Sequence, residues 1–181
     1  MLSRLLLPAV LVVAACSTPG DTADDTAATT APQEASSPID AQNPLAYDDA
    51  DCNLSTPLQP GVPGSPGHLI ASPRNPNGDS ELAVMMRQFI DDLTEARIQA
   101  QGGGQVKPMF ATHRMMRCAW PTNPSERDQG YDMRAQAYLF AVRQFDAAPS
   151  QMSYNAIVAN CIACHQASCN SVVPLIEKLK W

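Results

Sequence analysis

Two cysteines and a histidine stand together near the end of the chain, as Cys161, Cys164 and His165. The pattern Cys-x-x-Cys-His is typical of the covalent attachment of c-type haem. Each thiol would add across a haem vinyl group to form a thioether, and the imidazole would become the proximal ligand of the iron. The spacing suits this chemistry, because two thiols three residues apart lie on one face of a helical turn. We therefore predict that the chain binds haem c through these three residues.

The same short pattern has two other interpretations, a redox-active dithiol and half of a zinc site. A redox dithiol of this type opens a helix within a βαβ unit. A structural zinc site needs a second pair of ligands at similar spacing. The sequence offers neither feature, so haem attachment is the favoured interpretation.

The first residues have the pattern of a secretory signal. Arg4 precedes an apolar run at 5–13, and small residues follow this run. A permanent membrane-spanning helix would need about 20 apolar residues, so the run is too short for that role. We predict a signal peptide at 1–15.

Cys16 follows this run in the order Val-Ala-Ala-Cys, which resembles the lipobox of bacterial lipoproteins. The resemblance implies cleavage before Cys16 and a diacylglycerol on its sulfur, and two or three acyl chains anchor a protein stably. The alternative is ordinary cleavage with Cys16 incidental. Ser17 follows instead of Asp, which favours the outer membrane. We expect a lipid-anchored protein on the periplasmic side of the bacterial cell envelope, with its membrane contact at Cys16.

The segments 16–51 and 52–78 differ in composition from the rest of the chain. Residues 16–51 are acidic and nearly free of large apolar side chains, which predicts a disordered tether. The net charge of the chain is -6, and the tether carries it, because no Lys or Arg lies between Arg4 and Arg74. Residues 52–78 are rich in Pro and Gly, which predicts an extended segment with turns. No basic patch points to nucleic acid as a partner.

Four segments of the remaining domain, 79–181, repeat apolar residues with helical spacing. The first is expected from the N-cap candidates Asp79 and Ser80 to Gly102, and the second from about Gln105 to Ala119. The third is expected from Thr122 or Asn123 to Pro149, and the fourth from about Ser150 to about Cys169. Pro174 is then expected to interrupt the chain before Leu175 to Trp181. Their apolar stripes consist of Leu82, Met85, Met86, Phe89, Ile90 and Leu93; Val106, Met109, Phe110, His113 and Met116; Tyr131, Ala135, Tyr138, Leu139, Val142 and Phe145; and Tyr154, Ile157, Val158, Cys161, Ile162 and His165. Asp92 is expected on the outer face of the first helix. No stretch alternates as a strand does. We predict an all-α fold, an antiparallel four-helix bundle with the haem between facing helices.

A haem motif near the end of a fourth helix resembles the arrangement of the cytochrome c prime group. The last hundred residues also resemble a group of small exported bacterial monohaem cytochromes. The matching elements are Met85-Met86-Arg87, Ala119-Trp120-Pro121-Thr122, Tyr154-Asn155 and Cys169. The chain departs from that group after Cys169, where relatives have Pro-Gly-Pro and this chain has Asn170-Ser171-Val172-Val173-Pro174. The resemblance implies a four-helix-bundle c-type cytochrome, for which a homodimer is an option.

The first-helix pattern around Met86 resembles that of the periplasmic b-type four-helix cytochrome, in which a Met at this position ligates iron. Met86 is therefore the first candidate for the distal ligand and Met85 the second, although Met at helical spacing is commonly core filler. A His/Met haem predicts electron transfer with a redox partner protein and no enzymatic activity. If neither Met binds iron, the alternative is a five-coordinate protein that binds NO or CO, as in the cytochrome c prime group. A peroxidase-type activity would use His113 as a distal group. A lone His on an apolar face is usually structural, however. The other histidine, His68, is expected to face solvent.

Three cysteines remain, Cys52, Cys118 and Cys169. The predicted compartment is oxidising, which permits a disulfide. In an up-and-down bundle all three cysteines come to the same end, so the spacing leaves their pairing open. The relatives carry a cysteine at the position of Cys169 without an obvious partner. That resemblance implies a pair between Cys52 and Cys118 and a buried Cys169; a pair between Cys118 and Cys169 is the alternative.

Overall fold

The computed structural model describes residues 52–181. Its contacts divide the chain into two units, 1–37 and 38–181, and the described residues all belong to the second. The helical elements are α1 (Glu81–Gln101), α2 (Phe110–His113), the 3₁₀ turns η1 (Arg114–Cys118) and η2 (Pro124–Glu126), α3 (Gln129–Ala147), α4 (Gln151–Ser168), η3 (Asn170–Val172), α5 (Val173–Ile176) and η4 (Glu177–Leu179). Within 52–181 the only β-type pairing is one isolated bridge between Ile70 and Asp79. The prediction of an all-α fold is therefore confirmed for these residues.

The starts of α1 and α4 lie where the sequence places them. The side chain of Ser80 accepts a hydrogen bond from the backbone N–H of Ala83 at 3.2 Å. Ser150 and Ser153 form a reciprocal capping box, in which each side chain accepts from the other's backbone N–H. Such caps satisfy the N–H groups that a helix start leaves without partners.

The second helix is shorter than predicted, because α2 begins at Phe110 and not near residue 105. Pro108 has no backbone N–H, and the side chain of Asp146 on α3 accepts hydrogen bonds from the N–H groups of Met109 and Phe110 at 2.9–3.1 Å. This cap from a distant helix fixes the start of α2. After one turn the chain tightens into η1.

The third helix also begins later than predicted, at Gln129 instead of beside Asn123. Asn123 caps only the short turn η2. The effective cap of α3 is Asp128, whose side chain accepts from the N–H of Tyr131 at 2.6 Å. Pro174 does not interrupt the last helical segment either; it lies in the first turn of α5, where a missing N–H costs nothing.

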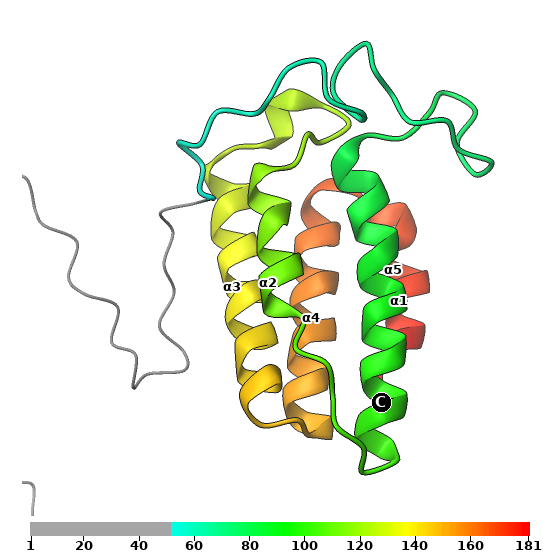
Figure 1. Cartoon of the computed structure of the whole chain (residues 1–181), viewed down its shortest axis with the longest axis vertical. Helices are drawn as coiled ribbons and strands as arrows, with labels where there is room; N and C mark the ends of the chain where they lie inside the picture. Colours follow the sequence, from blue (N-terminus) through cyan, green and yellow to red (C-terminus); the bar gives the residue numbers. More distant parts are fainter. Residues whose placement is uncertain (1–51) are drawn as a thin grey trace, which may run out of the picture. The chain divides into compact units, whose positions relative to one another are not determined.

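Helices α3 and α4 lie side by side (Figure 1) and pack along their length. The apolar stripe predicted for α3 is buried in full. From α4, Tyr154, Ile157 and Val158 have no exposed surface. Helix α1 lies on the other side of α4, with α5 and η4 behind it in the same view. Its central stripe is only partly buried apart from Phe89 and Leu93.

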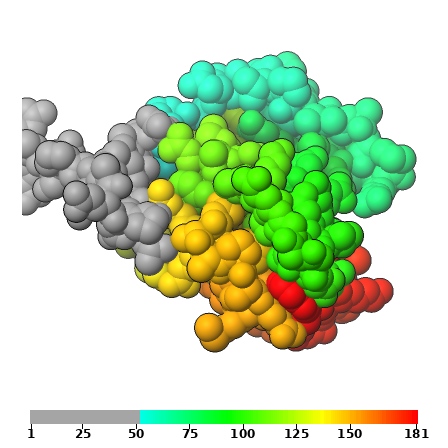
Figure 2. Space-filling model, turned by 60° about the horizontal axis from the view of Figure 1, so that its bottom comes forward, coloured from blue at the N-terminus to red at the C-terminus, as the bar shows by residue number. Residues whose placement is uncertain are grey.

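Helix α1 is attached at both of its ends. At the first turn, the N–H of Leu82 donates to the carbonyl of Trp120 at 2.9 Å, and the N–H of Trp120 donates to the carboxylate of Glu81 at 3.0 Å. Near its C-terminal end, the guanidinium of Arg97 donates to the carbonyls of Leu179 and Lys180 at 3.0 and 3.1 Å. Figure 2 shows the C-terminal residues lying beside α1 at this end.

The segment 52–78 crosses the N-terminal end of α1. The N–H of Glu81 donates to the carbonyl of Gly64 at 3.3 Å. Gly64 has φ +90°, and a Cβ there would meet the backbone of Glu81 at 2.2 Å. Only glycine allows this close approach, because other residues avoid this conformation and have no room for the side chain.

Candidate functional site

Four of the predicted site residues line one cavity of about 380 Å³ between α1 and α4. Cys161, Cys164 and His165 contribute from α4, and Met86 contributes from α1. The rest of the wall is mainly apolar and includes Leu82, Phe89, Ile90, Leu93, Met116, Tyr131, Tyr138, Leu175, Ile176 and Leu179. A volume of this size lies within the range of ligand and cofactor sites, about 300–1,000 Å³.

Both motif cysteines are free thiols. Burial raises the pKa of Cys161 to about 12, and the neighbouring Cys164 adds to this effect. Burial also raises the pKa of Cys164, although Arg134 on α3 opposes the shift through a hydrogen bond and its charge. The two sulfurs are therefore neutral thiols at pH 7, held on one face of α4.

His165 follows directly on the same helix and lines the same cavity. Burial lowers its pKa below the ordinary value of 6.5. The imidazole is therefore neutral at pH 7, which is the form that binds a metal ion through a ring nitrogen.

The two candidate methionines differ in position. Met86 lines the cavity, whereas Met85 is not among the residues of its wall. Both side chains are partly buried and pack against the core. Of the two, only Met86 shares the cavity with His165.

The cavity has a polar end that sequence reasoning missed. Arg74, Arg87, Ser80 and Thr122 contribute to the wall there. Arg87 pairs with the buried Asp79, and the hydroxyl groups of Ser80 and Thr122 lie 3.1 Å apart. Arg87 follows Met86 directly in the sequence. This adjacency to a candidate ligand was the signal that could have indicated Arg87 as a residue of the cavity wall.

The remaining histidines lie outside the cavity wall. His113 is completely buried and lies behind the wall, stacked on Phe89 with ring centroids 3.9 Å apart. Its ring nitrogens contact Tyr138 and Asp92. The prediction that Asp92 faces away from the core is therefore wrong in part. His68 is exposed in the segment 52–78, as expected.

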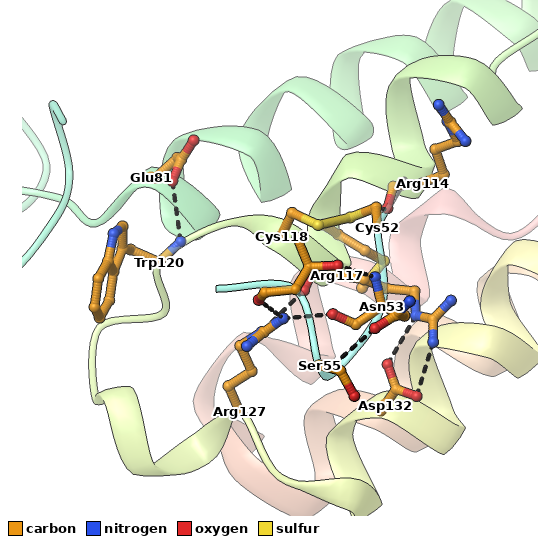
Figure 3. Close-up of a disulfide and its surroundings, with 12 residues drawn as sticks. Cys52, Asn53, Ser55, Glu81, Arg114, Arg117, Cys118, Trp120, Arg127 and Asp132 are labelled. Carbon is orange, nitrogen blue, oxygen red and sulfur yellow. Dashed lines mark hydrogen bonds and ion pairs between the residues drawn. A yellow bond between two sulfur atoms is a disulfide. The ribbon is translucent and has the colours of Figure 1, made fainter. Parts of the chain in front are cut away.

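Cys52 and Cys118 are joined by a disulfide, which is the pairing that the family resemblance implies (Figure 3). The buried guanidinium of Arg117 beside it donates to both carboxylate oxygens of Asp132 at 2.7 and 2.9 Å. Arg127 donates to the carbonyls of Asn53 at 2.6 Å and of residue 56 at 2.8 Å. The start of the segment 52–78 is thus fixed to the end of η1.

The expectation that Cys169 is buried is wrong. Cys169 is a free and exposed thiol at the C-cap of α4, and part of it borders the cavity. The helix ends there with the N–H of Cys169 bonded to the carbonyl of His165, and η3 turns the chain away.

Three predictions lie outside the described residues: the signal peptide at 1–15, the tether at 16–51 and the lipidated Cys16. Within 52–181, no helix is both long and apolar enough to cross a membrane. The same residues contain no group of three or more His, Cys, Asp or Glu side chains arranged to hold a metal ion.

No family model, curated protein or solved structure matches the chain.

Proposed function

We propose that the chain is a monohaem c-type cytochrome that transfers electrons in the periplasm, built as an antiparallel four-helix bundle similar to the cytochrome c prime group. The observation that carries the proposal is the shared cavity. Two free thiols, a neutral imidazole and a thioether from the facing helix all border one apolar space.

The residues of the cavity fit a haem. The motif thiols and His165 supply two attachment points and one ligand within five residues of α4. Most of the wall is apolar, and the guanidinium groups of Arg74 and Arg87 also line it, with Arg87 paired to the buried Asp79. An amphiphilic macrocycle with two carboxylates suits a space that is apolar over most of its surface and has guanidinium donors in its wall.

A bound haem would supply a one-electron couple at iron. Cys161 and Cys164 would fix the group covalently, so it is retained in both oxidation states. His165 would hold the iron from the side of α4 and Met86 from the side of α1. A thioether ligand needs no proton and favours the reduced state, which raises the potential. The apolar walls would keep water away from a bound haem, and attachment of α1 at both ends would limit movement of Met86.

The location and the partners are part of the proposal. Cys16 would carry the lipid at the periplasmic side of the envelope, favouring the outer membrane, and the acidic tether 16–51 would separate the lipid from the helical domain. The redox partner would be a protein that reaches the domain in that compartment.

The experiment begins with the full chain, made in cells that attach haem covalently. Its mass should increase by one haem, and replacement of both Cys161 and Cys164 by Ala should abolish the increase. Cys169→Ala is the matched control, because Cys169 also borders the cavity but lies outside the motif, and it should retain the haem. A chain that gains no haem under these conditions would contradict the proposal.

The distal ligand is tested by Met86→Ala with Met85→Ala as its neighbour control. Met86→Ala should convert a low-spin spectrum to high spin, lower the reduction potential and allow CO to bind. Met85→Ala should leave the spectrum nearly unchanged. If the parent protein already binds CO and its spectrum does not change in Met86→Ala, binding of NO or CO replaces electron transfer as the proposed function.

A further inference from the structure

A line of hydrogen bonds leads from the cavity wall to the surface of α1. Tyr138 on α3 lines the cavity, and its hydroxyl oxygen lies 2.6 Å from Nδ1 of His113. Nε2 of His113 lies 3.2 Å from a carboxylate oxygen of Asp92 on α1. The side chain of His113 has no exposed surface, whereas that of Asp92 is 24% exposed. A buried base is thus connected to solvent through one carboxylate.

His113 lies directly behind two aromatic side chains of the cavity wall. Its ring stacks on Phe89, with centroids 3.9 Å apart, and lies parallel to Tyr138, with centroids 5.9 Å apart. Both aromatic residues border the cavity. His113 is itself fully buried behind this wall, and charges in such surroundings interact more strongly than they do in water.

The hydrogen bonds suit both protonation states of His113. A carboxylate can only accept, so Nε2 carries a proton and donates it to Asp92. In the neutral ring, Nδ1 accepts from the hydroxyl of Tyr138. In the protonated ring, Nδ1–H donates to the oxygen of Tyr138, because a phenol can donate or accept. Neither state leaves a buried polar atom of the ring without a partner.

The charged and titratable groups around His113 come from two helices. Burial lowers the pKa of His113 below 6.5, while the hydrogen bond and charge of Asp92 and the charge of Asp146 raise it. Asp92 belongs to α1, and Asp146 and Tyr138 belong to α3; Tyr138 in turn faces Cys161 and Tyr154 of α4. His113 is therefore neutral at pH 7 but has anionic neighbours that favour its protonation.

We propose that His113 is a redox-linked proton site, with Asp92 as its contact to solvent and Tyr138 as the group that receives the new hydrogen bond. When one electron from the redox partner enters the cavity, one proton from water binds to His113; both leave again on oxidation. The added negative charge of the electron is offset by the proton, so the buried region keeps its net charge. This inference rests on the proposed function, because it needs a one-electron couple in the cavity.

The test uses the full-length, haem-loaded protein and measures its reduction potential between about pH 5 and pH 8, the range in which His titrates. The potential should fall as the pH rises, by at most about 59 mV per pH unit for a one-electron couple. His113→Gln should remove most of this slope. His68→Gln is the matched control, because it replaces an exposed His in the segment 52–78, and it should keep the slope.

A second variant and a direct measurement cover the case in which His113→Gln does not fold. Asp92→Asn removes the carboxylate that favours the protonated ring, so the sloping range should move to lower pH. In weakly buffered solution, reduction of the wild-type protein within the sloping range should take up protons, and reduction of the Asp92→Asn protein at the same pH should take up fewer.

A potential that does not depend on pH, or a slope that His113→Gln leaves unchanged, would overturn the proton site. So would a sloping range that Asp92→Asn leaves in place, or reduction without proton uptake. These results are distinct from failure of the proposed function, which would appear earlier as a chain without covalently bound haem.

Discussion

The two halves of α4 differ in how the space beside them is filled. In the first half, the closed side, the side chains of Ile157 and Val158 have no exposed surface and pack into a continuous core. In the second half, the open side, Cys161, Cys164 and His165 border a cavity of about 380 Å³. The same apolar stripe is therefore packed closed at one end of the helix and left open at the other.

This difference shows that the two sides must be stabilised in different ways. The closed side has packed apolar side chains, which contribute by removing surface from water. On the open side, Met86 and Ile90 of α1 are only partly buried, and hydrogen bonds hold that helix at its two ends. Trp120 and Gly64 contact its first turn, and Arg97 contacts the C-terminal residues. An apolar space of this kind remains open only when its frame is fixed from outside.

The disulfide belongs to that outer frame, and its removal should have the largest effect. It closes a loop of 66 residues that contains all of α1. Loop-closure entropy for this length predicts that Cys52→Ala with Cys118→Ala lowers the free energy of unfolding by about 4 kcal/mol. Urea denaturation checks this value. Cys169→Ala, which removes a free thiol, should change stability by less than about 0.5 kcal/mol; equal effects of the two changes would contradict a framing role for the disulfide.

The same truncation on each side of the core tests the comparison itself. Ile157→Ala on the closed side should destabilise the protein by about 3 kcal/mol, since it leaves a cavity in packed surroundings. Ile90→Ala on the open side should cost less than half as much in a Cys161→Ala, Cys164→Ala chain, where no haem is attached. In the haem-loaded chain the cost of Ile90→Ala should rise toward that of Ile157→Ala. Equal costs in the haem-free chain would mean that the open side is packed as well as the closed one.

The sequence predicts those parts of the fold that depend on nearby residues. Ser80 and Ser150 mark the starts of α1 and α4, because their partners lie three residues away. The start of α2 could not be found in this way, since its cap is Asp146, 36 residues along the chain from Phe110. The start of α3 was missed for another reason: two N-cap residues, Asn123 and Asp128, stand close together, and the first caps only a short turn.

In the candidate site, too, the sequence predicts what depends on nearby residues and misses what depends on the packing of helices. The motif predicts Cys161, Cys164 and His165, and periodicity turns Met86 inward. The cavity that brings Met86 to them, and the contact of Asp92 with His113, require the packing of three helices. No spacing along one helix reveals that an acid on its outer face meets a buried imidazole from another segment.

The open side and the region beside the disulfide should also respond differently to acid, and this is the smallest effect, since a shift of one pKa unit is worth about 1.4 kcal/mol. On the open side, burial lowers the pKa of folded His113 below its unfolded value of 6.5. Between these two values the unfolded chain binds more protons than the folded one, so the free energy of unfolding decreases as the pH falls below 6.5.

Beside the disulfide, burial tends to raise the pKa of Asp132. Hydrogen bonds from Arg117 and Gln136 and the charges of Arg117 and Arg127 outweigh that effect and leave the pKa below 3.8. The stabilising contribution of Asp132 is therefore complete above pH 3.8 and is lost only as the pH falls through the folded pKa. Urea denaturation of the oxidised, haem-loaded protein from about pH 8 to about pH 5 thus probes the open side, because a ligated His165 does not titrate there. The wild type and His68→Gln should lose stability over this range and His113→Gln should not; an equal loss in all three proteins would place the acid-sensitive group elsewhere in the molecule.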